Sequence, residues 1–85
     1  MFFVYLIQSE SDQRYYIGQT QDLTARLEEH NNGEVPSTCN RVPFRLIGYE
    51  TYKTRSKARW REYSLKKSAH RRKQFIEHVS KNIPG

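Results

Sequence analysis

The stretch FFVYLIQSESDQRYYIG (residues 2–18) decides how the chain begins to fold. Its first six residues are aromatic or aliphatic, which favours a β-strand over residues 2–7. A polar turn follows and strand character resumes over residues 14–18, so we predict a hairpin. Side chains alternate across a strand, so the two faces carry Phe3, Tyr5 and Ile7 on one side and Phe2, Val4 and Leu6 on the other. Because both sets are apolar, this strand should be covered on both faces.

The remaining segments carry helix and strand signals in turn. Polar residues that can cap a helix precede two of them, at Thr20 or Asp22 and at Thr54 or Ser56. The predicted elements are a helix ending near Asn31, a loop over residues 34–43, a strand over Phe44–Thr51, and helices over residues 57–67 and 69–81. The order β-β-α-β-α-α is an α+β fold in which a small sheet needs helices packed against it. At 85 residues the chain has room for one domain, residues 1–85.

Charge is divided unevenly along the chain. Residues 1–40 hold two Lys or Arg and six Asp or Glu, a net charge of −4. Residues 41–85 hold thirteen Lys or Arg and three Asp or Glu, a net charge of +10. A basic half of this kind is the electrostatic footprint of nucleic-acid binding. A solvated helical surface would carry the same charges, and that alternative stays open. A membrane-surface role needs a broad apolar helix face, whereas Phe75, Ile76 and Val79 supply a narrow one.

Other features limit the location of the protein and its partners. The longest apolar run, residues 2–7, is far too short to cross a membrane, and no charged leader precedes it. The single cysteine, Cys39, excludes an internal disulfide framework and a Cys-rich zinc site. We therefore expect a soluble, cytoplasmic monomer with no disulfide-linked partner.

Two sets of side chains could contact nucleic acid. Lysines and arginines between residues 53 and 73 are expected to hold backbone phosphates without reading bases. They are Lys53, Arg55, Lys57, Arg59, Lys66, Lys67, Arg71, Arg72 and Lys73. Five aromatic residues could stack on exposed bases, although packing in the core or at its rim is the expected role of each. They are Tyr15, Tyr49, Tyr52, Trp60 and Tyr63.

One acidic side chain, Glu62, falls on the inward side of a segment that is otherwise basic. A buried carboxylate is costly unless it is paired or holds a metal. An ion pair with Arg61, Arg59 or Arg26 is one interpretation of this position. The alternative is that Glu62 belongs to a chemical site.

That second interpretation joins Glu62 to two strand tyrosines and to an arginine and a histidine one helical turn apart. These four residues are Tyr5, Tyr16, Arg26 and His30. Together the five offer what phosphodiester hydrolysis needs: an oxygen ligand for Mg²⁺, a cation for the charge that develops on phosphorus, and groups for proton transfer. One glutamate suffices, because magnesium commonly binds one or two carboxylates and completes its shell with water and phosphate.

The same positions resemble the two half-motifs that name the GIY-YIG nuclease superfamily. Phe3-Val4-Tyr5 matches the first half-motif and, after ten residues, Tyr16-Ile17-Gly18 matches the second. The resemblance covers about Phe2 to Lys73 and continues through Thr20, Leu23, Arg26, Leu27, His30, Asn31-Asn32-Gly33, Tyr49-Glu50, Ala58, Glu62 and Leu65-Lys66. It is closest to small stand-alone members related to the N-terminal nuclease domain of the bacterial excision-repair incision subunit.

The resemblance implies a three-stranded antiparallel sheet flanked by helices, and a nuclease that uses Mg²⁺ or Mn²⁺. By position, Tyr16 would act as general base or orient the attacking water, with Tyr5 supporting it. Arg26 would contact the scissile phosphate, and Glu62 would be the sole metal ligand. His30 would lie near the site as a further catalytic group.

One further position fits the family pattern, and two others depart from it. Gly18 fits as the residue that closes the strand and lets the backbone turn into the helix. Phe3 replaces the glycine of the first half-motif. Gln19 or Thr20 stands near where several active members carry a lysine beside the catalytic tyrosine.

The sequence therefore predicts a metal-dependent endonuclease that acts on DNA rather than RNA with little sequence specificity. A nucleic-acid-binding module with the same fold but little turnover is the alternative, and the missing lysine favours it. A small interaction protein with an ion-paired Glu62 is the third possibility.

Overall fold

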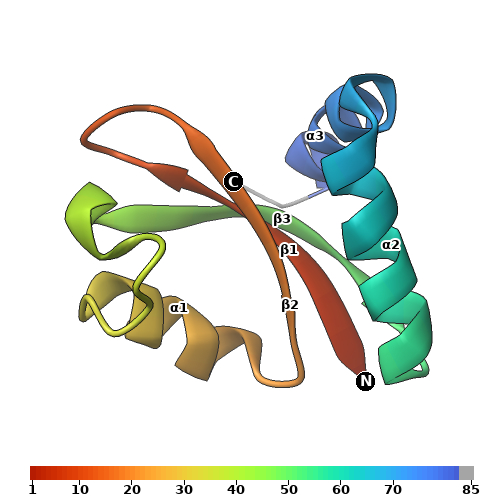
Figure 1. Ribbon diagram of the computed structural model, residues 1–85, viewed down its shortest axis with the longest axis horizontal. Coiled ribbons are helices and arrows are strands. Elements are labelled where there is room, and N and C mark those ends of the chain that lie inside the picture. The colour runs from red at the N-terminus through yellow and green to blue at the C-terminus, as the bar shows by residue number, and fades with distance from the viewer. Residues whose placement is uncertain (83–85) are drawn as a thin grey trace.

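The computed structural model describes residues 1–82, so the last three residues of the predicted domain lie outside it. Its elements follow the predicted order β-β-α-β-α-α (Figure 1). They are β1 (Phe2–Ser9), β2 (Tyr15–Thr20), α1 (Leu23–Asn31), a 3₁₀ turn (Cys39–Arg41), β3 (Phe44–Tyr52), α2 (Arg55–Lys67) and α3 (Ala69–Asn82). Among residues 1–82, none of the helices combines the length and the apolar character needed to span a bilayer.

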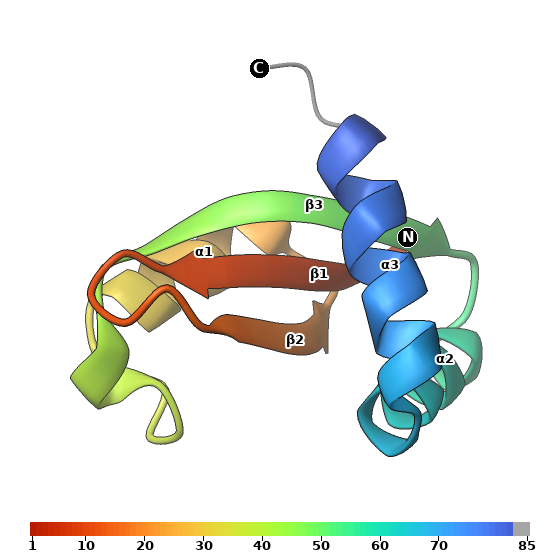
Figure 2. The ribbon, with the colours of Figure 1, turned by 90° about the horizontal axis from the view of Figure 1, so that it is seen from above.

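The sheet is antiparallel, as predicted, and its strand order β2-β1-β3 puts the first strand in the centre. In this register Tyr5 lies opposite Gly18 on β2 and opposite Tyr49 on β3. Helices α2 and α3 lie side by side, away from α1 (Figure 2). The central strand can therefore bury both of its faces, and β2 forms one edge of the sheet.

The alternation of side chains along β1 sorts the core into two clusters, as the sequence predicts. Val4 and Leu6 pack with Ile17 against buried residues of α2 and α3, namely Ala58, Leu65, Phe75 and Val79. Tyr5 and Ile7 pack with Phe44 on the opposite face, where leucines of α1 border them. Each cluster is small, so neither helical layer can be removed without exposing one face of β1 to water.

Helix caps and one glycine set the position of the helices. Asp22 is the N-cap of α1 and accepts a hydrogen bond from the Ala25 amide (3.0 Å). Thr54 is the N-cap of α2 and accepts from the Lys57 amide (3.2 Å), so this helix begins at Arg55 and not at residue 57. A Cβ atom at Gly48 would lie 2.5 Å from the Val79 carbonyl oxygen, so glycine is what lets α3 approach β3 closely.

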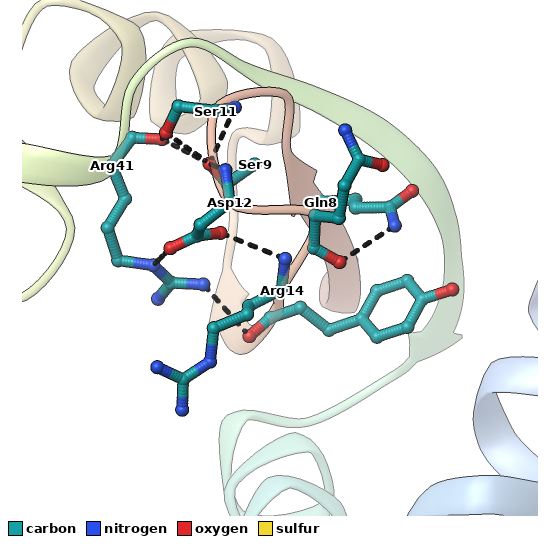
Figure 3. A network of polar contacts seen from close by, with 8 residues as sticks. Gln8, Ser9, Ser11, Asp12, Arg14 and Arg41 are labelled. Carbon is teal, nitrogen blue, oxygen red and sulfur yellow. Dashed lines mark hydrogen bonds and ion pairs between the residues drawn. The ribbon is translucent and has the colours of Figure 1, made fainter.

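A polar network joins the β1–β2 turn to the loop that follows α1 (Figure 3). Ser9 is fully buried; its Oγ donates to the Arg41 carbonyl (2.6 Å) and accepts from the amides of Ser11 (3.1 Å) and Asp12 (3.2 Å). The Arg41 Nε donates to Asp12 Oδ2 at 2.9 Å. The Arg14 amide and the Arg41 guanidinium both donate to the Asp12 carboxylate and lower its pKa. The loop is therefore fixed at its far end, near Arg41.

The Ser9→Ala variant tests the importance of this network. Alanine would leave a carbonyl and two amides without their hydroxyl partner, so we expect a loss of about 1–3 kcal/mol in the free energy of unfolding. Ser11→Ala is the matched control, because the Ser11 hydroxyl is exposed and its bond to the same carbonyl is long (3.4 Å). Urea denaturation of the two variants gives the comparison. Equal losses would show that Ser9 has no special structural role.

Candidate functional site

The five residues predicted for a chemical site come from four different elements. Tyr5 lies on β1, Tyr16 on β2, Arg26 and His30 on α1, and Glu62 on α2. Ring centroids are 6.4 Å apart for Tyr5 and Tyr16, 5.8 Å for Tyr5 and His30, and 5.1 Å for Tyr16 and His30. The structure therefore brings both tyrosines and the histidine into mutual contact, next to the β2 edge that runs between α1 and α2 (Figure 1).

A buried hydrogen-bonded chain runs through this cluster. The Tyr5 hydroxyl lies 2.8 Å from His30 Nε2, and His30 Nδ1 lies 2.8 Å from Thr38 Oγ1. The Thr38 hydroxyl donates in turn to the Val35 carbonyl (3.4 Å). With the one hydrogen of that hydroxyl given to the Val35 carbonyl, we assign the proton between His30 and Thr38 to His30 Nδ1. Nε2 is then an acceptor, and Tyr5 donates to it.

Burial keeps both ring groups of this chain neutral. His30 and Tyr5 are almost completely buried, with 0% and 1% of their surface exposed. Burial, together with the nearby Arg26 charge, lowers the pKa of His30. Burial also raises the pKa of Tyr5 to about 12, against the opposing effect of Arg26. At neutral pH the pair is a phenol and a neutral imidazole, which can pass or share a proton but carries no net charge.

Arg26 lies in front of this buried pair. Its side chain is 33% exposed, and a hydrogen bond with the Tyr5 hydroxyl is the main reason that its pKa is raised. Its ion-pair partner is Glu29, at 3.4 Å, and not Glu62. An exposed ion pair of this length is weak, so the guanidinium can also meet an anionic ligand.

Glu62 is partly open and is not sealed against an arginine. Its side chain is 22% exposed and accepts a hydrogen bond from Lys66 Nζ at 2.8 Å. The predicted pairing with Arg61, Arg59 or Arg26 is wrong, because Arg61 binds Glu50 instead (2.9 and 3.2 Å) and the helix offers Lys66 at the favourable i,i+4 position. Lys66 Nζ also lies 5.6 Å from the centre of the Tyr16 ring, which brings Glu62 close to the tyrosines.

A divalent metal fits this arrangement in one way. Among residues 1–82 there is no group of three His, Cys, Asp or Glu side chains that could surround a metal ion. A single accessible carboxylate, on Glu62, matches the way magnesium binds when water and substrate phosphate complete its shell. Lys66 is 51% exposed and flexible enough to release the carboxylate.

Gly18 is at the site for a reason other than the predicted one. The strand does not close there, since β2 runs on to Thr20. A Cβ atom at Gly18 would lie 2.4 Å from the Tyr5 hydroxyl oxygen and 2.6 Å from its ring carbon Cζ. Gly18 therefore leaves the space that the Tyr5 ring and hydroxyl occupy next to β2.

The residues predicted to contact phosphates divide into two groups. Eight are exposed: Lys53, Arg55, Lys57, Arg59, Lys66, Lys67, Arg71 and Lys73. Arg72 is half-buried and donates to the carbonyls of Leu65 (3.1 Å) and Lys66 (3.4 Å), so it caps the C-terminus of α2. The Arg72 side chain therefore does not face outward as predicted, because its guanidinium binds carbonyls of α2.

Two residues of the site were missed from the sequence. Thr38 is fully buried and fixes His30, yet a lone threonine in an irregular loop gives no periodic signal. The Asn31 side chain donates to the Phe44 carbonyl (3.0 Å) and accepts from its amide (2.6 Å), which joins the end of α1 to β3. Its sequence signals were a polar amide at the end of a helix and a place in the family resemblance, and neither indicates a bond to β3.

Comparison with known proteins agrees with the fold. Residues 1–75 match the model of the GIY-YIG catalytic domain, the superfamily whose half-motifs the chain resembles. The chain therefore belongs to the GIY-YIG family.

More narrowly, its relatives are small UPF0213 proteins. A UPF0213 protein of Haloquadratum walsbyi is 38% identical over 82 residues, which cover 95% of this chain and 91% of that protein. A UPF0213 protein of Staphylococcus aureus is 42% identical over 65 residues, covering 75% of this chain and 78% of the relative. The solution NMR structure of a UPF0213 protein from Bacillus halodurans has 29% identity and a TM-score of 0.56, covering 91% of this chain and 84% of that one.

The His30 tautomer gives one test of the buried chain. Long-range ¹H–¹⁵N NMR spectra at pH 7.5 should show the proton on Nδ1, and the signal should titrate below the ordinary histidine pKa of ~6.5. In Thr38→Val the hydroxyl is lost and the tautomers should mix, whereas Thr38→Ser should keep the Nδ1–H form. Protonation of Nε2 in the unaltered protein would contradict the assigned direction of the chain.

The fit between Gly18 and Tyr5 gives a second test. Gly18→Ala should displace the Tyr5 ring and cost about 1–3 kcal/mol in the free energy of unfolding, because the core has no room for the methyl group. In a Tyr5→Ala background the same substitution should cost much less, since its clash partner is gone. The double-mutant cycle is measured by chemical denaturation. An unchanged cost in that background would show that another contact is responsible.

Proposed function

We propose that the protein is a divalent-metal-dependent endonuclease that hydrolyses phosphodiester bonds, with DNA rather than RNA as its substrate and little sequence specificity. The observation that supports this most directly is the layering of the site. Tyr16, Arg26 and Glu62 are partly exposed, and the neutral Tyr5–His30 pair lies buried behind them. A phosphate could reach Tyr16, Arg26 and Glu62 directly. The buried Tyr5–His30 pair can act only through those exposed side chains.

In the proposed reaction a water molecule attacks phosphorus and the leaving oxygen departs. Tyr16 orients that water and takes up its proton while it passes its own hydroxyl proton to solvent, and the Tyr5–His30 pair holds the Tyr16 ring in place from behind. Arg26 donates to the phosphate oxygens and stabilises the added negative charge. Glu62 would hold Mg²⁺ or Mn²⁺, which supplies charge neutralisation at the phosphate and a bound water for the leaving group.

The exposed basic side chains of α2 and α3 support the choice of substrate. They contact phosphates rather than base edges, so binding should be strong at low salt and insensitive to sequence. We propose that residues 1–85 act as one domain and as a monomer in the cytoplasm.

One observation favours a second function. Glu62 is already paired with Lys66, and Gln19 or Thr20 stands near where several active members carry a lysine beside the catalytic tyrosine. A nucleic-acid-binding module with little turnover would have this arrangement. The two functions differ in whether a metal displaces Lys66 from the carboxylate.

Cleavage of supercoiled plasmid in Mg²⁺ or Mn²⁺ is the test. Glu62→Gln, Arg26→Ala and Tyr16→Phe should each lower the rate at least about 100-fold, because each removes a group that acts in the transition state. Glu77→Gln, an exposed glutamate of α3, is the matched control and should cleave like the unaltered protein.

The outcomes separate the alternatives. Cleavage that persists in Glu62→Gln would contradict the proposed mechanism. Salt-sensitive binding without cleavage in any metal would favour the binding module instead.

A further inference from the structure

An exposed aromatic pair lies on α2, outside the candidate site. Trp60 is 65% exposed and Tyr63 is 54% exposed, and their rings stack at 5.9 Å with an angle of 27° between their planes. The expectation that these two residues pack in the core or at its rim is therefore wrong. A tryptophan and a tyrosine side by side in solvent form a flat apolar surface, the type of surface that marks a binding site.

A hollow of about 430 Å³ adjoins this pair, within the size range of small-ligand sites. Trp60 lines it together with Tyr52, Ser56, Lys57 and Arg61. Its floor is mostly apolar, so it favours a flat uncharged ring over an ion. The hollow and the stacked pair share the Trp60 ring and form one surface, which we call the aromatic platform: Tyr52, Ser56, Lys57, Trp60, Arg61 and Tyr63.

Hydrogen bonds hold the walls of the hollow in place. The Arg61 guanidinium donates to both carboxylate oxygens of Glu50, at 2.9 and 3.2 Å, and the Tyr52 hydroxyl donates to the same carboxylate at 2.7 Å. These bonds fix the Tyr52 and Arg61 side chains before any ligand arrives. A preformed wall lowers the entropy cost of binding.

The charge around the platform selects an anionic ligand. Helix α2 carries six Lys or Arg against one Glu, and Lys67 Nζ lies 5.3 Å from the centre of the Tyr63 ring. A ligand with a flat aromatic ring and a negative backbone satisfies both features, and an unpaired nucleotide has both. An acidic peptide would use the lysines and arginines but would leave the stacked rings without a partner.

We infer that the aromatic platform binds an unpaired base of a nucleic-acid strand, stacked on Trp60 with its phosphates against the basic side chains of α2. The inference rests on the proposed function, because it names the form of substrate that the same protein would cut. Base stacking selects unpaired nucleotides, since the bases of a duplex already stack on their neighbours.

The position of the platform relative to Glu62 suggests which part of the strand it holds. Trp60 and Glu62 are two residues apart and project from different sides of the helix. A helix is about 10–12 Å across with its side chains, which equals the length of about three stacked nucleotides at ~3.4 Å each. A strand that stacks on Trp60 could therefore cross α2 and reach the candidate site a few nucleotides away.

Fluorescence of Trp60 tests the inference directly, because it is the only tryptophan in the chain. Titration with a 12-nucleotide oligothymidylate should quench the emission, whereas a blunt duplex of the same length should quench it far less. Trp60→Ala should weaken binding of the labelled single strand by about 5- to 100-fold in fluorescence anisotropy. Trp60→Phe should recover much of the affinity, and Gln74→Ala, which changes an exposed uncharged residue of α3, is the control and should bind normally.

The results would distinguish this inference from the proposed nuclease function. No quenching at saturating single strand, or equal affinity of Trp60→Ala and Gln74→Ala, overturns the platform even if the plasmid is still cut. Quenching that persists in Glu62→Gln, with cleavage absent in every metal, supports the platform and overturns the nuclease. Equal quenching by duplex and single strand would also overturn it, since stacking requires an unpaired base.

Discussion

The hydrogen bond between the Tyr5 hydroxyl and His30 Nε2, at 2.8 Å, is the contact on which the rest of this small fold depends. It joins the central strand to α1 inside the core, where a polar group without a partner is costly. The residues around this bond support it in different ways. Gly18 leaves space for the phenol ring, Thr38 satisfies the second histidine nitrogen, and Arg26 closes the chain on the open side. A chemical requirement at one pair of atoms therefore fixes a glycine, a loop residue and a helix position that are far apart in sequence.

The division of the basic residues follows a similar logic. Some arginines of the basic half serve the structure: Arg72 caps α2, Arg61 fixes Glu50, and Arg41 holds the β1–β2 turn. The exposed lysines and arginines of α2 and α3 remain available to phosphates. The net charge of the chain thus overstates the charge that a ligand can use, because part of it is consumed in internal contacts.

Features with a local cause could be predicted from the sequence. Alternation along β1 and the caps of α1 and α2 depend on neighbouring residues, so the two faces of β1 and the starts of the helices could be predicted, the latter to within a few positions. The residues of the candidate site were predicted because their types and spacing resemble a known motif. The role of Gly18, the position of Arg72 and the partner of Glu62 depend on contacts between distant elements or on a choice among nearby cations. Thr38 could not be found, since nothing in its own segment indicates that a histidine lies beside it.

The loop after α1 is held at its middle by the Thr38–His30 contact and near its end by the Ser9–Arg41 bond. Surface loops generally tolerate insertions and exchange between relatives. This loop is a rigid connection, and its length is constrained because one extra residue would move Thr38 away from the His30 imidazole. Transplanting the five site residues onto another scaffold would therefore fail unless the loop and its serine anchor were moved with them. For the same reason, the sequence and length of this loop should change more slowly in evolution than those of other irregular surface loops.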